Sequence, residues 1–178
     1  MTTAGYFNSV EKLKEGKSYP FKVCNMVTLQ DERNYYILED PFSIRHLLPS
    51  WFYSKYGIEQ GKMINCDVEK INCTGRVYLE PEHPYYSKNC IREFHLLSIQ
   101  INEQRRKQKL ILTDIFDNEI EVDCPGELVN SISGLSHVEC IIVCIRKGKP
   151  VLTLSKYFRE KMKMKVTSCQ TEPSDKHL

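Results

Sequence analysis

The sequence lacks the features that would assign it to several common functional classes. No apolar run approaches the roughly 20 residues that a membrane-spanning helix needs, and the N-terminus shows no basic segment followed by an apolar core. We therefore expect a cytoplasmic protein with no membrane partner. The chain also has no glycine-rich phosphate loop, no Gly-x-Ser-x-Gly and no His-Glu-x-x-His. These absences favour a binding module without a cofactor over an enzyme.

Cysteine is abundant, but its spacing favours neither a disulfide framework nor a zinc site. Most of the eight cysteines lie in alternating apolar segments, where a thiol acts as a small core residue. Cys66 and Cys73 are separated by six residues, and Cys140 and Cys144 by three. Neither spacing is the Cys-x-x-Cys pair of structural zinc sites. We predict reduced thiols and no metal site.

An excess of positive charge is also missing. The net charge of the chain is +2. Residues 17–84 hold eight Lys/Arg and nine Asp/Glu, residues 92–156 hold nine of each, and residues 157–178 hold five and three. Any binding of nucleic acid must therefore come from local basic patches and depend on salt concentration.

The first half of the chain has the period-two alternation of half-buried β-strands. Ile64, Cys66 and Val68 alternate with polar residues, and the turn at 72–75 ends on Gly75, which can adopt positive φ. Arg76, Tyr78 and Glu80 are then expected to point outward from the next strand. The predicted strands are 19–29, 35–39, 44–49, 63–71 and 76–80, with a short helix at 50–56.

The second half repeats this order after a stiff connector that contains Pro81 and Pro84. Its predicted strands are 94–101, 110–114, 119–124, 137–145 and 151–154, with a short helix at 127–135. Leu97, Ile99 and Ile101 are expected to share one face of the first of these. We expect a flexible lead-in at 1–16, domains at 17–86 and 87–156, and a basic helical or disordered tail at 157–178. Internal duplication is the strongest organisational signal.

Five short strands with a helix between the third and fourth have the order of the OB fold, a small Greek-key barrel. We therefore predict a mainly β protein with two five-stranded OB-fold barrels in tandem. The strand at 138–145 is apolar on both faces, which predicts that both faces are covered. Either the first barrel or a protein partner covers the second face, and we favour the first barrel.

The first barrel resembles the ribosomal S-one-type RNA-binding motif, a subclass of the OB fold. The resemblance rests on 44–49 (Ile-Arg-His-Leu-Leu-Pro), which is similar to that family's third strand with its outward His, and on Gly-Arg-Val-Tyr-Leu at 75–79. Leu-Ser-Lys at 154–156 resembles the end of the same final strand. The resemblance implies that RNA lies across the second and third strands, beside His46 and Arg76.

The residues predicted to contact nucleic acid are aromatic or basic. In the first barrel they are Tyr35, Tyr36, Phe42, Arg45, His46, Lys70, Arg76 and Tyr78, and in the second Arg105, Arg106, Lys107 and Lys109 of a basic turn at 102–109 and Arg146, Lys147 and Lys149 of another. Adjacent strand residues face opposite ways, so only one of the two tyrosines can stack on a base. Phe42 either extends that platform or plugs the barrel end, and Trp51 is predicted to be a core or cap residue.

Two functions remain open at this point. The first is non-catalytic binding of single-stranded RNA or ssDNA across the first barrel, with phosphate contacts from basic loops of the second. The second function is a protein-interaction module whose basic turns are ordinary solvated surface. In the second barrel, Glu121 and Asp123 fall near the places of Arg45 and His46, which favours the first barrel as the nucleic-acid-binding one.

Overall fold

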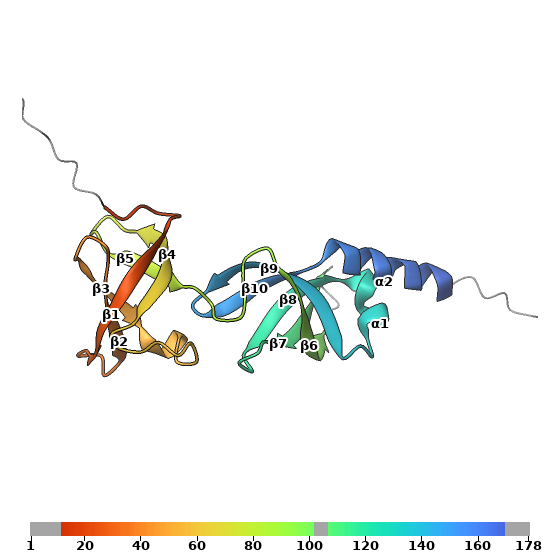
Figure 1. Cartoon of the computed structure of the whole chain (residues 1–178). Coiled ribbons are helices and arrows are strands. Elements are labelled where there is room, and N and C mark those ends of the chain that lie inside the picture. The colour runs from red at the N-terminus through yellow and green to blue at the C-terminus, as the bar shows by residue number, and fades with distance from the viewer. Residues whose placement is uncertain (1–11, 102–106, 170–178) are drawn as a thin grey trace, which may run out of the picture. The chain divides into compact units, whose positions relative to one another are not determined.

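The structure, a computed structural model, describes residues 12–101 and 107–169 (Figure 1). Contacts divide the chain between Pro84 and Tyr85 into two compact units, which we call the first and second units. Each contains one five-stranded antiparallel sheet, so the predicted mainly β architecture with two such units in tandem is confirmed. No helix within the described ranges is long and apolar enough to cross a membrane.

In the first unit the sheet order is β3-β2-β1-β4-β5, the order of an OB barrel. The elements are β1 (Ser18–Thr28), β2 (Asn34–Glu39), β3 (Arg45–Pro49), the 3-10 turn η1 (Ser50–Phe52), β4 (Met63–Ile71) and β5 (Val77–Pro81). The helix predicted at 50–56 is thus reduced to a single turn.

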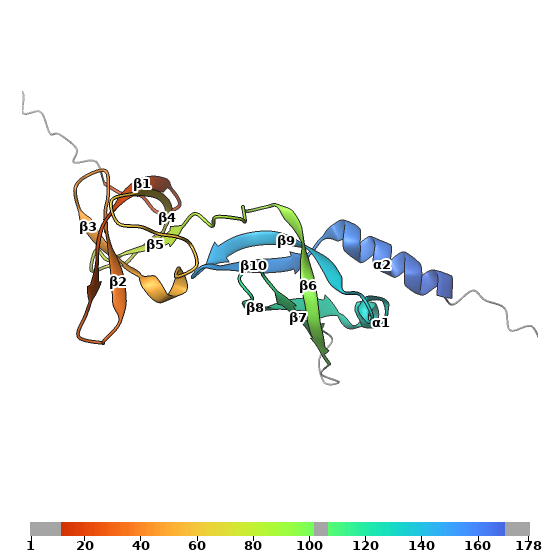
Figure 2. The same cartoon turned by 60° about the horizontal axis from the view of Figure 1, so that its bottom comes forward.

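The second unit repeats the pattern with the order β10-β9-β6-β7-β8. Its elements are β6 (Ile91–Gln100), β7 (Lys107–Thr113), β8 (Glu119–Pro125), η2 (Gly126–Leu128), α1 (Val129–Ile132), β9 (His137–Arg146), β10 (Lys149–Leu154) and α2 (Lys156–Cys169). The sheet curls until its edge strands β8 and β10 approach one another, which nearly closes the barrel (Figure 2).

The first strand of each unit changes its hydrogen-bonded neighbour partway along, and a β-bulge lies just after the change. In β1, Lys22 is opposite Met63 of β4 and also Glu39 of β2, and the register to β2 shifts across Cys24. In β6, His95 is opposite His137 of β9 and Thr113 of β7, and the register to β7 shifts across Leu97. One long strand thereby carries both halves of each sheet.

Each unit has its own apolar core. In the first unit Phe21, Leu38 and Leu48 are almost completely buried, and Leu13 of the predicted lead-in packs with them. In the second unit Phe158 and Met162 of α2 are buried against the barrel residues, and α2 lies beside α1 (Figure 1). The first part of the predicted tail is therefore part of the second core. Residues 1–11 and 170–178 of the predicted lead-in and tail lie outside the described residues.

Two β-bulges change which side chains of β6 and β9 face the core, so the facing predicted from simple alternation is wrong at these positions. Leu97 is the residue across which β6 shifts, so Phe94, Leu96 and Ile99 contact the core while Leu97 is exposed. Ile101 is 66 % exposed and not part of the core. In β9 the register to β10 shifts across Val143, so the apolar face changes sides.

The bulge at Val143 explains most of the two-sided apolar pattern of β9. Val138, Cys140 and Ile142 are buried before it, whereas Ile145 packs against the same core after it. Residues at even positions before the bulge and at an odd position after it therefore pack into the same core. That the first barrel covers the remaining outer residues stays a prediction.

We expect Leu38→Ala to lower the free energy of unfolding of the first unit by about 2–5 kcal/mol, because Leu38 is 0 % exposed and the substitution leaves a cavity. Leu47→Ala, a matched control on the neighbouring strand, removes a side chain that is 42 % exposed and should change stability by no more than about 0.5 kcal/mol. Urea unfolding followed by the fluorescence of Trp51, the only tryptophan, measures both. Equal losses in the two variants would contradict the assigned core.

The second unit should lose stability at alkaline pH. Burial raises the pKa of the Cys124 thiol from 9.0 to about 11. The pKa of Cys140 rises from 9.0 to about 12, mainly because the thiol is buried and further because the Glu139 carboxylate is nearby. The folded state binds these protons more tightly, so their stabilisation is complete below pH 9 and is lost as the pH rises through the folded pKa values. Urea unfolding followed by circular dichroism should show a smaller decline for Cys124→Ala than for the wild type. Parallel pH curves would contradict the prediction, and Cys73→Ser, an exposed thiol of the first unit, is the control.

Candidate nucleic-acid interface

Four hairpins of the structure share one turn geometry, in which a three-residue loop ends on a residue with positive φ. In the β2–β3 hairpin, Asp40 N donates to Ile44 O (2.9 Å), Ser43 N donates to Asp40 O (3.0 Å), and φ of Ser43 is 65°. The same two bonds recur at Leu29–Arg33, Asn72–Arg76 and Asp114–Asn118. The predicted positive φ of Gly75 is confirmed at 79°.

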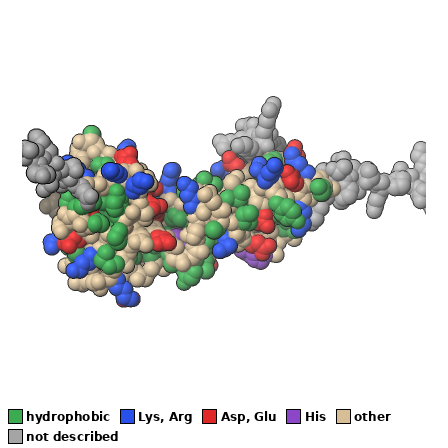
Figure 3. Space-filling model, turned by 45° about the horizontal axis from the view of Figure 1, so that its top comes forward, with side chains coloured by type: hydrophobic (Ala, Val, Ile, Leu, Met, Phe, Trp, Pro, Cys, Tyr) green, Lys and Arg blue, Asp and Glu red, His purple; other side chains and the backbone are tan. Residues whose placement is uncertain are grey.

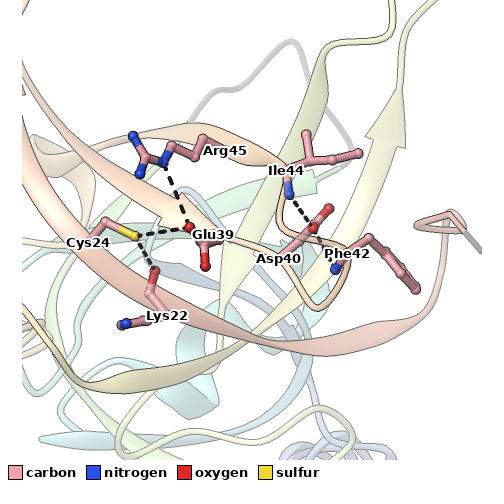
Figure 4. Close-up of polar contacts among 7 residues, drawn as sticks. All are labelled: Lys22, Cys24, Glu39, Asp40, Phe42, Ile44 and Arg45. Carbon is pink, nitrogen blue, oxygen red and sulfur yellow. Dashed lines mark hydrogen bonds and ion pairs between the residues drawn. The ribbon is translucent and has the colours of Figure 1, made fainter.

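Asp40 fixes the β2–β3 turn from inside (Figure 4). Its Oδ1 accepts hydrogen bonds from Phe42 N (2.8 Å) and Ile44 N (2.9 Å), and its Oδ2 lies 3.0 Å from Nε2 of His46. The Asp40 side chain is 1 % exposed and that of His46 is 10 % exposed. Asp114 occupies the same place in the second unit, where Phe116 N, Asn118 N and Asn118 Nδ2 donate to it.

His46 therefore does not point outward as the resemblance to the S-one-type motif implied. On β3 the inward residues are His46 and Leu48, and the outward ones are Arg45 and Leu47. The His46 ring also packs edge-on against the buried Phe21, with ring centroids 5.9 Å apart. His46 therefore supports the β2–β3 turn through its contact with Asp40.

The two tyrosines of β2 face opposite ways, as the alternation predicted. Tyr36 packs against the core of the first unit, whereas Tyr35 lines a surface groove. Phe42 also packs against the core and lies 6.4 Å from Tyr19 between ring centroids. Phe42 thus takes the plugging position, and Tyr35 is the second-strand aromatic that remains available for stacking.

A groove of about 420 Å³ crosses the outer side of the first unit between β3 and the start of β5. Its walls come from the β1–β2 loop, β2, β3 and the β4–β5 turn. The lining residues are Leu29, Tyr35, Ile44, Arg45, His46, Leu47, Gly75, Arg76 and Val77. We call it the β3–β5 groove. It lies on the face of strands two and three, between the two loops with which OB folds bind their ligands.

Aromatic rings and arginines are paired around the β3–β5 groove. The Arg76 guanidinium lies 5.3 Å above the ring of Tyr78, which is 42 % exposed. The Arg33 guanidinium lies 5.2 Å above the ring of Trp51, which in turn packs edge-on against Tyr35 at 5.2 Å. Trp51 is 39 % exposed and does not belong to the core of the first unit, so a core position is wrong. Arg33 is a residue that the sequence analysis did not identify.

Arg45, the other arginine that lines the groove, lies near a carboxylate. The Arg45 side chain is 69 % exposed and its Nε is 3.7 Å from Glu39 Oε2, while the thiol of Cys24 lies 3.9 Å from the same oxygen (Figure 4). Tyr35 Oη donates to Asp31 Oδ2 (2.8 Å), and this hydrogen bond lowers the pKa of Asp31 and raises the pKa of Tyr35. Lys70, exposed on β4, is the register partner of Tyr78.

Glu80 was expected to point outward from β5, but it is 6 % exposed. Its Oε2 accepts a hydrogen bond from Tyr53 Oη (3.2 Å). Burial is the main cause that raises the pKa of Tyr53, and the Glu80 carboxylate adds to it. The outward pair on this hairpin is therefore Arg76 and Tyr78 alone.

The corresponding face of the second unit has the opposite charge. Because the two Asp-centred turns are equivalent, Arg45 corresponds to Glu119, and Glu121 and Asp123 follow on the same side of β8. Lys109, predicted to lie in a turn, is part of β7 and forms ion pairs with Glu121 (2.9 Å) and Asp123 (3.6 Å). The hydrogen bond to Glu121 raises the pKa of Lys109.

The other predicted basic residues of the second unit that the structure describes lie on the β9–β10 hairpin and on β7. Arg146 and Lys149 are paired strand residues, and Lys147 and Gly148 form the two-residue turn between them, both with positive φ. This turn differs from the three-residue loop at Gly75. Lys107 is in β7, and Arg105 and Arg106 lie outside the described residues.

Comparisons with known proteins assign no family to this chain. No family model matches the chain, and no curated protein matches it. Among solved structures, the chain is similar to the cytoplasmic molybdate-binding protein ModG with molybdate bound, at 10 % identity and a TM-score of 0.27. That match covers 82 % of this chain and 100 % of ModG.

We expect Asp40→Ala to destabilise the first unit by about 2–4 kcal/mol, because it leaves two amide donors and His46 without their acceptor. Asp31→Ala removes an exposed turn carboxylate and should cost less than about 1 kcal/mol. Urea unfolding followed by Trp51 fluorescence compares the two variants. If Asp31→Ala proved as damaging as Asp40→Ala, the turn would not depend on the buried carboxylate.

Proposed function

We propose that the first unit binds single-stranded RNA or ssDNA in the β3–β5 groove, without catalysis. The observation that supports this most is the convergence of Tyr35, Arg45 and Arg76 on one groove from three separate segments of the chain. Exposed aromatic rings stack on bases of any sequence, and arginines contact the phosphates between them. We also propose that the first unit binds nucleic acid in the manner of the S-one-type motif, which it resembles at Arg76 and Tyr78.

The charge distribution favours weak, salt-dependent binding. Lys and Arg side chains occur singly or in small groups among acidic and apolar ones on the face drawn in Figure 3. Glu39 and Asp31 lie beside Arg45 and Tyr35, so a polyanion must compete with these carboxylates for two residues of the β3–β5 groove. Binding then depends on stacking more than on net charge.

The second unit takes an accessory part in this proposal. Its equivalent face carries Glu119, Glu121 and Asp123, and Lys109 is held by two of these carboxylates. That face repels phosphates. Further phosphate contacts would come from Arg146, Lys147 and Lys149 of the β9–β10 hairpin, as predicted from the sequence.

The proposal is tested by fluorescence anisotropy with a labelled RNA of about 12 nucleotides at about 50 mM salt, where phosphate contacts are strongest. Tyr35→Ala should weaken binding roughly 5-fold to 150-fold, since stacking contributes about 1–3 kcal/mol per base. Arg76→Ala should weaken binding and lower the dependence of log Kd on log salt by about 1. Lys62→Ala, which removes a positive charge outside the groove, is the matched control and should leave binding unchanged.

Two results would overturn this proposal. Absence of binding at low salt would exclude nucleic acid as the ligand. Binding that survives the double substitution of Tyr35 and Arg76 would place the interface elsewhere. The emission of Trp51, which touches Tyr35, should also change on binding and provides a label-free check.

A protein-interaction role is the second candidate, and exposed apolar residues of the second unit favour it. Ile91 of β6 is 50 % exposed and Val143 of β9 is 42 % exposed. Val143→Asp should abolish a protein contact at this face while the unfolding transition stays unchanged. If RNA binding is absent and this variant loses a partner, the protein-interaction role replaces the first proposal.

A further inference from the structure

The outer face of the second unit carries three like pairs across β6 and β9. Opposite residues are Ile91 with Ile141, Glu93 with Glu139, and His95 with His137. Leu96 and Ser136, the residues next to the histidines along the two strands, form a hydrogen-bonded pair in which Leu96 N donates to Ser136 O (2.9 Å). This places His95 and His137 in a non-hydrogen-bonded pair, the type in which opposite side chains come closest.

The two imidazoles are exposed and face each other. Their ring centroids are 5.4 Å apart, with an interplanar angle of 75°. Nδ1 of His137 lies 3.0 Å from Ser136 Oγ in a hydrogen bond, which leaves Nε2 as the other ring nitrogen of this exposed side chain. A hydrogen bond at the far nitrogen is how proteins orient a histidine that binds a metal.

The glutamate pair beside the histidines is electrostatically unfavourable, because like charges directly opposite on antiparallel strands repel. No ion pair among the described residues includes Glu93 or Glu139. Oε1 of Glu139 instead accepts a hydrogen bond from Ser155 Oγ, which fixes that side chain. Glu93 is exposed on the same strand as His95, two residues away.

We propose that His95 and His137 bind a divalent first-row transition metal ion such as Zn²⁺, with the Glu93 carboxylate as a third ligand. Imidazole nitrogen suits these ions better than it suits Mg²⁺ or Ca²⁺. The bound charge would also relieve the repulsion between the two glutamates. Water completes the coordination, since the face is open.

The spacing of the rings fits this ion. A Zn–N bond of about 2.05 Å, with roughly 1.1 Å more to the ring centre, places two imidazoles of a tetrahedral site about 5 Å apart. The observed 5.4 Å is close to this value. His137 keeps its hydrogen bond to Ser136, and rotation of the His95 ring about χ2, which is soft for histidine, can redirect its Nε2 without movement of the strands.

The third ligand requires a larger change. As the described side chains stand, no three His, Cys, Asp or Glu groups gather around one point. Glu93 and His95 are two residues apart on one strand, a span of about 7 Å, and the exposed Glu93 side chain can swing across it. Binding would therefore order Glu93 and join β6 to β9.

The test is Zn²⁺ titration of the full chain labelled with ¹⁵N-histidine, followed by the imidazole resonances in NMR. The chain has five histidines, so the site can be read residue by residue. Cys73→Ser is used as background, because Cys73 is an exposed thiol and thiolate sulfur is a zinc ligand that would compete for the ion. We expect the resonances of His95 and His137 to shift together and saturate at one equivalent, while the buried His46 and His83 do not move.

Variants separate the ligands from general surface binding. His95→Gln and His137→Gln should each lower the affinity at least tenfold, and Glu93→Gln should lower it less. His177→Gln removes a histidine outside the described residues and should leave the affinity unchanged. Should His95→Gln fail to fold by circular dichroism, His137→Gln alone decides, since it removes the other ligand.

The proposal is overturned if neither His95 nor His137 shifts up to about 100 μM Zn²⁺, a level at which a site with Kd near 1 μM is about 99 % occupied. It is also overturned if the variants bind as tightly as the parent chain. None of these outcomes depends on RNA binding, because the β3–β5 groove belongs to the other unit.

Discussion

Each unit is organised by one long strand that changes its hydrogen-bonded neighbour along its length. The first part of β1 pairs with β4 and its second part pairs with β2. β1 changes neighbours at Lys22, between the buried Phe21 and Val23, and its register to β2 then shifts across Cys24. In β6 the same change occurs at His95. Curvature, core and groove all follow from this change and the bulge beside it, because the bulge sets which side chains point outward beyond it.

The duplication separates what serves the fold from what serves a site. Asp40 and Asp114 hold equivalent turns with the same backbone hydrogen bonds, and both turns are followed by a strand whose outward residues differ in charge. The first strand presents Arg45 and the second presents Glu119. A framework of buried carboxylate, bulge and core is thus shared, whereas the residues that meet solvent have diverged. This is why a function proposed for the β3–β5 groove does not extend to the second unit.

Alternation and turn residues were enough to predict the strands of both units, to place Arg76 and Tyr78 on the surface, and to show that Tyr35 and Tyr36 face opposite ways. The errors arise where a residue's direction depends on a distant partner. Bulges at Leu97 and Val143 leave no mark in the local pattern, since an inserted residue looks like any other apolar one. The inward turn of His46 follows from the Asp40 carboxylate six residues away, and the burial of Glu80 follows from Tyr53 on another segment. Trp51 was misplaced because its partner Arg33 lies in a loop that alternation does not describe.

The hairpin turns also affect the chain before it folds. Glu32, Ser43 and Asp117 occupy the left-handed region where glycine is the commonest choice, with φ between 59° and 65°. Each incurs a conformational cost in the native state, yet a residue with a β-carbon has fewer unfolded conformations to give up than glycine has. In the Ser43 and Asp117 turns, the hydrogen bonds that the Asp40 and Asp114 carboxylates accept further restrict the backbone. Folding therefore costs less backbone entropy at these positions than it would cost with glycine.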